Sequence, residues 1–249
     1  MAKSERAEQL VSLLSSIEVG AAGDAAAARA LARIEPVEAA HTLKVLVAEA
    51  KTSPKVGQAL ASLSRALMLA SDADLPYTHR GRIYDAAAEF QMVEVAALFS
   101  KEPPIVAIEP DAARDQDPTL QHLTLGHKKM LARQANPDRI ARLAIEGDAR
   151  VIRELLLNPM MTEATVVRIV ARRPAKAETL LEVWRSPRWS ARAGVRKALA
   201  MNPYTPPEVA LKVLPHLLAG DLRAIAGDQA LHPSVRQLAG KLATRRKSK

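Results

Sequence analysis

The 249-residue sequence contains no cysteine and few aromatic residues, and these two absences exclude several classes of protein. Without cysteine there is no disulfide, no iron–sulfur cluster, no cysteine-ligated zinc site and no thiol nucleophile. Aromatic residues make up 3% of the chain, and the 10 glycines are outnumbered by 16 prolines. Because β-sheets draw on aromatic and β-branched side chains, this composition, rich in alanine, leucine, arginine and glutamate, predicts an all-α fold.

Long apolar runs are also missing. No stretch approaches the roughly 18 apolar residues of a membrane span, and the first ten residues, MAKSERAEQL, have no apolar segment after their charges. Together with the lack of cysteine, these absences predict a cytoplasmic protein without membrane association.

The common catalytic and metal-binding patterns are not found either. His122 and His127 lie five residues apart, which places them about 140° apart on a helix and off the shared face of a zinc-binding pair. Gly20-Ala-Ala-Gly23 lacks the lysine and hydroxyl residue of a phosphate-binding loop. We therefore expect no metal site, no cofactor and no enzymatic activity.

The charge is divided unevenly along the chain. Residues 1–125 carry 12 basic and 17 acidic residues, whereas residues 126–249 carry 24 basic and 10 acidic residues. This asymmetry indicates either an anionic partner for the basic half or electrostatic contact between the halves. Charge alone does not choose between them.

Residues 1–100 are expected to form an acidic helical region. Apolar residues recur there at three and four positions, as in Leu10, Leu13 and Leu14. Residues 101–118 are rich in proline and aspartate and lack helical periodicity, which predicts a linker. The six helices expected before it span residues 4–17, 24–34, 36–51, 54–70, 76–91 and 92–100.

Helix start signals recur through residues 119–243, mostly 12 to 16 residues apart. Asn136 and Ser186 each precede a proline, as N-cap residues do, and Thr205-Pro-Pro-Glu208 has the pattern of a capping box. The expected helix starts are Thr124, Asn136, Asp148, Thr162, Ala177, Ser186, Thr205, Asp221 and His232.

Two segments of this region, Val151–Pro159 and Val195–Pro203, align without gaps at a distance of 44 residues. Each is followed by a threonine and another apolar helix. Helices this short cannot bury an apolar face alone, so the repetition predicts a basic domain of stacked helices, a solenoid, over residues 119–243. Residues 244–249 are expected to form a basic, disordered tail.

The phrases Leu157–Thr162 and Met201–Ala210 resemble the Asn-Pro-x-x-Thr-Pro-x-x-Leu signature of variant leucine-rich repeats. These are α-helical superhelices related in architecture to HEAT repeats. The resemblance covers residues 124–243, and it implies a right-handed α-solenoid of short helices. The iron–sulfur module of one family member cannot be present without cysteine.

Arginines recur at spacings of three or four residues in successive helices, which places each set on one helical face. In stacked helices these sets would merge into a basic ridge suited to carboxylates or phosphates. A solvated polar face, partly balanced by glutamates, is the alternative interpretation. The predicted partner-binding residues are Arg150, Arg153, Arg168, Arg172, Arg188, Trp189, Arg192 and Arg196.

The sequence thus predicts a non-catalytic helical-repeat adaptor or scaffold that binds a protein with an acidic surface. One alternative is a sequence-tolerant nucleic-acid-binding protein whose arginines contact phosphates. A more remote one is an enzyme similar to the HEAT-like alkylpurine DNA glycosylases, with Glu182 acting beside Trp184 and Trp189. Trp184 is, however, expected to pack against Leu180 in the core.

Overall fold

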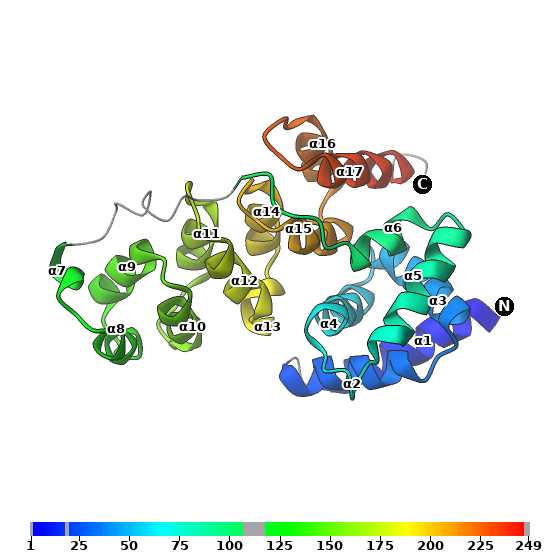
Figure 1. The fold of residues 1–249 in the computed structure, drawn as a ribbon, viewed down its shortest axis with the longest axis horizontal. Coiled ribbons are helices and arrows are strands. Elements are labelled where there is room, and N and C mark those ends of the chain that lie inside the picture. Colours follow the sequence, from blue (N-terminus) through cyan, green and yellow to red (C-terminus); the bar gives the residue numbers. More distant parts are fainter. Residues whose placement is uncertain (1, 18–19, 107–117, 247–249) are drawn as a thin grey trace.

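The fold is all-α, as the composition predicts (Figure 1). A computed structural model describes residues 2–17, 20–106 and 118–246, and no β-strand occurs within these ranges. No helix in them combines the length and the apolar character that a membrane span requires. The composition therefore predicts the secondary-structure class correctly.

The amino-terminal region is a bundle in which all six expected helices are present (Figure 1). Its apolar stripes converge on Leu31, Leu43, Leu60 and Leu63, none of which is exposed to solvent. The central helix of the bundle, α4 (Pro54–Leu69), is buried on nearly all sides, and Arg65 is the only charged residue between residues 56 and 67. The elements are α1 (Ala2–Ser15), α2 (Ala21–Ala32), α3 (Pro36–Glu49), α4 (Pro54–Leu69), α5 (Tyr77–Glu89), α6 (Val93–Ala96) and the 3₁₀ helix η1 (Ala97–Phe99).

The expected linker is described only in part. Residues 101–106 contain no helix, residues 107–117 lie outside the described ranges, and the next helix begins at Pro118. The helices that follow are short, with bounds α7 (Pro118–Gln121), α8 (Leu125–Ala132), α9 (Pro137–Glu146), α10 (Ala149–Leu157), α11 (Glu163–Ala171), α12 (Ala177–Arg185), α13 (Pro187–Ser190), α14 (Ala193–Met201), α15 (Pro207–Val213), η3 (Leu214–His216), α16 (Ala219–Gly227) and α17 (Pro233–Arg245).

These helices pack in two rows (Figure 1). In the first row, α8, α10 and α12 lie side by side; in the second, α9, α11 and α14 do. Between α11 and α14 the approach is so close that a Cβ on Gly194 would come within 2.9 Å of the Glu163 carboxylate. Each helix buries one apolar face against its neighbours, as α10 does with Val151, Ile152 and Leu155.

Most of the expected helix caps form. The side chains of Thr124, Asn136, Asp148 and Thr162 each accept a hydrogen bond from a main-chain amide in the first turn. Ser186 is followed by a helix at Pro187, but its side chain makes no capping bond. Side-chain oxygens at these positions satisfy amides that the helix itself leaves unpaired.

The capping box expected at Thr205 is wrong. Helix α15 begins at Pro207 with Pro206 as its N-cap, and the Thr205 hydroxyl is buried without a partner in the described part of the chain. A residue before proline is held in the extended region, so Pro206 cannot be helical and the helix starts one residue too late for Thr205 to cap it.

The two Asn-Pro turns have the same hydrogen-bonding pattern. The Asn158 amide nitrogen donates to the carbonyls of Ala132 (2.7 Å) and Gln134 (3.0 Å), at the end of α8, and its oxygen accepts from the amide of Met160. The Asn202 amide nitrogen likewise donates to carbonyls at the end of α11, and its oxygen accepts from the amide of Tyr204. Both asparagines are 2% exposed. Each therefore caps the carboxyl end of the neighbouring helix in its row.

The 44-residue alignment does not relate equivalent helices. It pairs α10, of the first row, with α14, of the second. Within the rows, helices begin at residues 125, 149 and 177 and at residues 137, 163 and 193. The alignment thus detects a shared turn rather than the repeat period. A third turn of this kind escaped the sequence search: Asp228 accepts from the amide of Ala230, and His232, four residues on, is the next N-cap.

The carboxy-terminal helices pack against the rest of the molecule. Helix α15 contacts α4 and η1 of the amino-terminal bundle, and α17 packs on α15 and α16. The disordered tail is expected from residue 244, which is too early in the sequence. Helix α17 extends through Arg245, and the Arg246 guanidinium donates to the carbonyls of Pro215 and Leu217. Residues 247–249 of that tail lie outside the described ranges.

Candidate functional site

The predicted partner-binding arginines lie on both rows of helices. Those of the first row and of α13, which follows it, are Arg150, Arg153 and Arg188, and those of the second row and its caps are Arg168, Arg172, Arg192 and Arg196. Spacing within single helices cannot show to which row each helix belongs. The predicted arginines therefore come from both rows of helices.

In the first row, arginines join neighbouring helices through ion pairs. Arg133 at the end of α8 contacts Glu154 on α10 at 2.9 Å, and Arg153 on α10 makes two bonds of 2.7 and 2.8 Å to Glu182 on α12. Arg185 contacts the same carboxylate at 2.7 Å. The positive charge of these arginines stabilises the stacking of the helices, so less of that charge is available to bind a partner.

The constellation of Glu182 with two tryptophans is part of the core. Hydrogen bonds from Arg153 hold the pKa of the Glu182 carboxyl below its usual value against the opposing effect of burial, and Arg185 adds to this. Trp184 is fully buried, as expected, and Trp189 is 3% exposed. The Glu182 carboxylate is bound by two guanidinium groups and is 6% exposed, and both tryptophans are buried, so this geometry gives the glycosylase alternative no support.

Trp189 and Arg196, two predicted partner-binding residues, are occupied inside the protein. The Trp189 indole donates to the carbonyl of Leu156 at 2.8 Å, and the half-buried Arg196 guanidinium donates to the carbonyl of Ser190 at 2.7 Å. Burial, with repulsion from Arg65, lowers the pKa of Arg196 to about 10. These side chains satisfy main-chain carbonyls where α13 turns against its neighbours, which helical spacing does not reveal.

Two further predicted arginines are also engaged. Arg150 contacts Asp148, the N-cap of its own helix, at 2.9 Å, and Arg172 donates to the carbonyl of Ile145 at the end of α9. Three remain exposed and without an ion pair among the described residues, and these are the exposed arginine set: Arg168, Arg188 and Arg192. The Arg188 guanidinium lies 4.4 Å from the centre of the Trp189 ring, so this one is held in place by a cation–π contact.

A buried basic cluster at the junction of the two halves escaped the sequence search. Arg65 on α4 is 1% exposed, makes two bonds of 2.8 Å to the Asp24 carboxylate, and donates to the Ser190 hydroxyl on α13 at 3.3 Å. The sequence signal available was a lone arginine within an otherwise apolar and small-residue helix. Its contacts tie the amino-terminal bundle to the second half.

His216 lies near Arg65 in the same buried cluster. It is buried, and neither ring nitrogen has a hydrogen-bond partner in the described part of the chain. Burial lowers the pKa of His216 well below its ordinary value, and repulsion adds to this from Arg196, Arg246, Arg65 and Lys51. The imidazole is therefore neutral in the folded protein at physiological pH.

We expect His216 to make the fold sensitive to mild acid. Below pH ~6.5 the unfolded chain takes up a proton that the folded chain does not, so stability falls by ~1.4 kcal/mol per pH unit from this group. His216→Leu should remove that slope between pH 6.5 and 5, measured by urea denaturation at each pH. The exposed His122, replaced by alanine, serves as the control, and an unchanged slope in His216→Leu contradicts the assignment.

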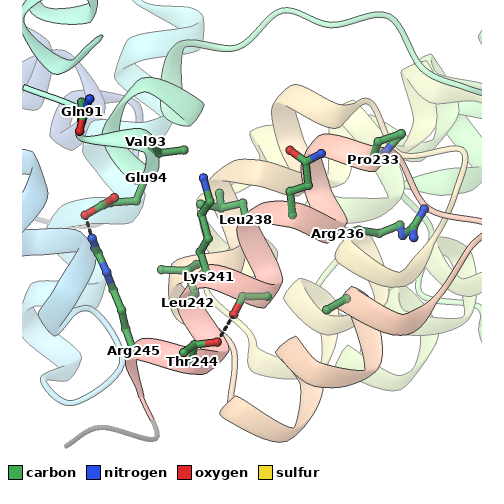
Figure 2. A pocket seen from close by; sticks show the side chains of 13 residues that line it. Gln91, Val93, Glu94, Pro233, Arg236, Leu238, Lys241, Leu242, Thr244 and Arg245 are labelled. Carbon is green, nitrogen blue, oxygen red and sulfur yellow. Dashed lines mark hydrogen bonds and ion pairs between the residues drawn. The ribbon is translucent and has the colours of Figure 1, made fainter. Parts of the chain in front are cut away.

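A cleft of about 760 Å³ lies between α6 and α17 (Figure 2). Glu94, on α6, and Arg245, near the end of α17, form an ion pair across it. Arg236 and Lys241 also line the cleft. The pair joins α17 to the amino-terminal bundle, and within the described ranges no three potential metal ligands converge here or elsewhere.

Comparison with family models, with curated proteins and with solved structures found no match to this chain. What the structure itself shows is an all-α protein with many short helices and a basic second half.

Proposed function

We propose that this protein is a non-catalytic scaffold, a right-handed α-solenoid of HEAT-like or variant leucine-rich-repeat type, that binds a macromolecule with an acidic surface. The observation that carries the proposal is the exposed arginine set, Arg168, Arg188 and Arg192, which has no carboxylate partner in the described part of the chain. The repeated capping of one helix by the next, at Asn158 and Asn202, supports the solenoid. The lack of cysteine supports a cytoplasmic location.

The exposed arginine set suits an acidic protein surface for physical reasons. A guanidinium group binds a carboxylate through two parallel hydrogen bonds and is more weakly hydrated than an ammonium group, so its desolvation costs less than that of a lysine. Arg168 and Arg192 belong to helices that pack directly against each other, α11 and the start of α14. The packed helices fix the main chain beneath these groups, so binding has to order only the side chains.

The alternative partner is a nucleic acid, favoured by the basic excess of residues 126–249. Phosphate contacts would make the affinity fall steeply with salt concentration. Titration with an unrelated duplex DNA and an unrelated RNA, at low and at physiological salt, separates the two proposals. The scaffold proposal expects neither nucleic acid to bind at either salt concentration.

The scaffold proposal is tested by charge reversal. A triple variant with Arg168→Glu, Arg188→Glu and Arg192→Glu should retain its fold and lose at least tenfold in affinity for the captured partner, about 1.4 kcal/mol. The matched control reverses three exposed cations of the amino-terminal bundle, with Arg33→Glu, Lys55→Glu and Arg82→Glu.

Affinity capture with quantification of each retained protein provides the measurement. Proteins kept by the wild type and by the control triple, but lost from the arginine triple, support the proposal. An identical set retained by both triples contradicts it, because both carry the same change in net charge.

A further inference from the structure

A separate cavity of about 250 Å³ lies where the amino-terminal bundle meets α15. Its wall is formed by α4, α5, η1 and α15, and it gathers Tyr77, Tyr84 and Phe99, three of the seven aromatic residues of the chain. The Tyr84 and Phe99 rings lie edge to face with their centres 6.3 Å apart. A cavity lined by aromatic and apolar side chains with a few polar groups has the usual form of a small-molecule site.

The same wall carries three cations, Arg80, Lys101 and Lys212, with Glu208 as the one acidic residue among them. Lys212 is 2% exposed, and its ammonium donates to the main-chain carbonyl of Glu208 at 3.1 Å. No ion pair to Lys212 exists among the described residues. Burial lowers the pKa of Lys212 to about 8; Glu208 opposes this and Lys101 adds to it.

Arg80 shows the same lack of a counter-ion. One terminal nitrogen of its guanidinium donates to the carbonyl of Leu67 at 3.3 Å, but its Nε is buried with no acceptor among the residues that the structure describes. Buried charged donors are normally paired, because leaving them unpaired is costly. Arg80 and Lys212, two cations without a carboxylate partner among the described residues, therefore border one cavity.

We propose that this cavity binds a small aromatic anion, an aryl carboxylate or aryl phosphate, with Arg80 and Lys212 holding the anionic group and Tyr84 and Phe99 contacting the ring. Lys101 lies 5.5 Å from the centre of the Tyr77 ring at the mouth and adds a third positive charge. The site is independent of the exposed arginine set, since none of its residues belongs to that set.

Calorimetric titration of the full chain with phenyl phosphate tests the proposal. The ring and the anion each contribute, so phenyl phosphate should bind at least tenfold more tightly than inorganic phosphate and than phenol. At pH 8, near the pKa of Lys212, binding should also take up about half a proton per ligand, seen as a dependence of the heat on the buffer.

Two variants and a control locate the site. Lys212→Met should weaken phenyl phosphate at least tenfold and abolish the proton uptake, while its melting temperature stays at or above that of the wild type because a buried, uncompensated charge is removed. Tyr84→Leu should weaken phenyl phosphate several-fold and leave inorganic phosphate unchanged. Lys241→Met, at an exposed lysine of α17, should change neither.

The outcomes separate cleanly. Equal affinity for phenyl phosphate and inorganic phosphate overturns the aromatic part of the proposal, and unchanged binding by Lys212→Met overturns the location. Loss of partner capture in the arginine triple has no bearing on either result, so the two proposals fail independently.

Discussion

Replacing Asn202 by alanine is expected to lower the free energy of unfolding by about 3 kcal/mol, because three hydrogen bonds are lost and buried carbonyls are left unpaired. The Asn202 side chain is 2% exposed and bonds to the carbonyls of Val170 and Arg172 and to the amide of Tyr204. Urea denaturation at neutral pH measures the change.

Two companion variants sharpen this test. Asn136→Ala removes a single N-cap bond at a less buried position and should cost about 1 kcal/mol. Asn202→Asp keeps the acceptor for Tyr204 but loses both donors, so it should be at least as damaging as the alanine variant. If Asn202→Ala costs no more than Asn136→Ala, then the turn does not hold α11 and α14 together in the way described.

Replacing Asp24 by asparagine is expected to lower the free energy of unfolding by about 3–5 kcal/mol, as removal of one partner from a buried ion pair does. Arg65 is 1% exposed, and the Asp24 carboxylate is its only anionic partner among the described residues. Arg196 is close enough to Arg65 to repel it. The asparagine variant keeps the shape of the site and leaves the guanidinium charge unbalanced.

A double variant separates charge from packing at this site. Asp24→Asn combined with Arg65→Met should recover much of the stability that Asp24→Asn alone loses, since no buried charge is left unpaired. Asp74→Asn, which removes the exposed partner of Arg29, should have little effect on denaturation. A double variant no more stable than Asp24→Asn would refute the electrostatic explanation.

Much of the secondary structure could be predicted from local sequence. The six amino-terminal helices and the caps at Thr124, Asn136, Asp148 and Thr162 depend on residues within one or two turns of each other, and they form as expected. Thr205 shows the limit of such signals, because Pro206 and Pro207 move the helix start one residue beyond the position that Thr205 could cap.

The candidate sites could be predicted far less well. Periodicity finds the face of a helix, but it does not show that Arg153 and Arg196 bond to neighbouring elements. Residues of α5, η1 and α15 line the cavity around Lys212. Helices α5 and α15 are more than a hundred residues apart in the sequence. The spacing of residues within one segment gives no information on contacts between elements so far apart in the sequence.

The sequence by itself determined the all-α class, most of the helix boundaries and the uneven charge, because propensity, capping and proline geometry act over a few residues; the starts expected at Thr205 and Asp221 are the exceptions. Only the tertiary structure decided which arginines stay exposed, that Arg65 and His216 are buried near each other, and that Lys212 lines a cavity without an ion pair among the described residues. Those outcomes depend on which helices pack side by side, and burial, which sets the cost of each charge, comes from that packing.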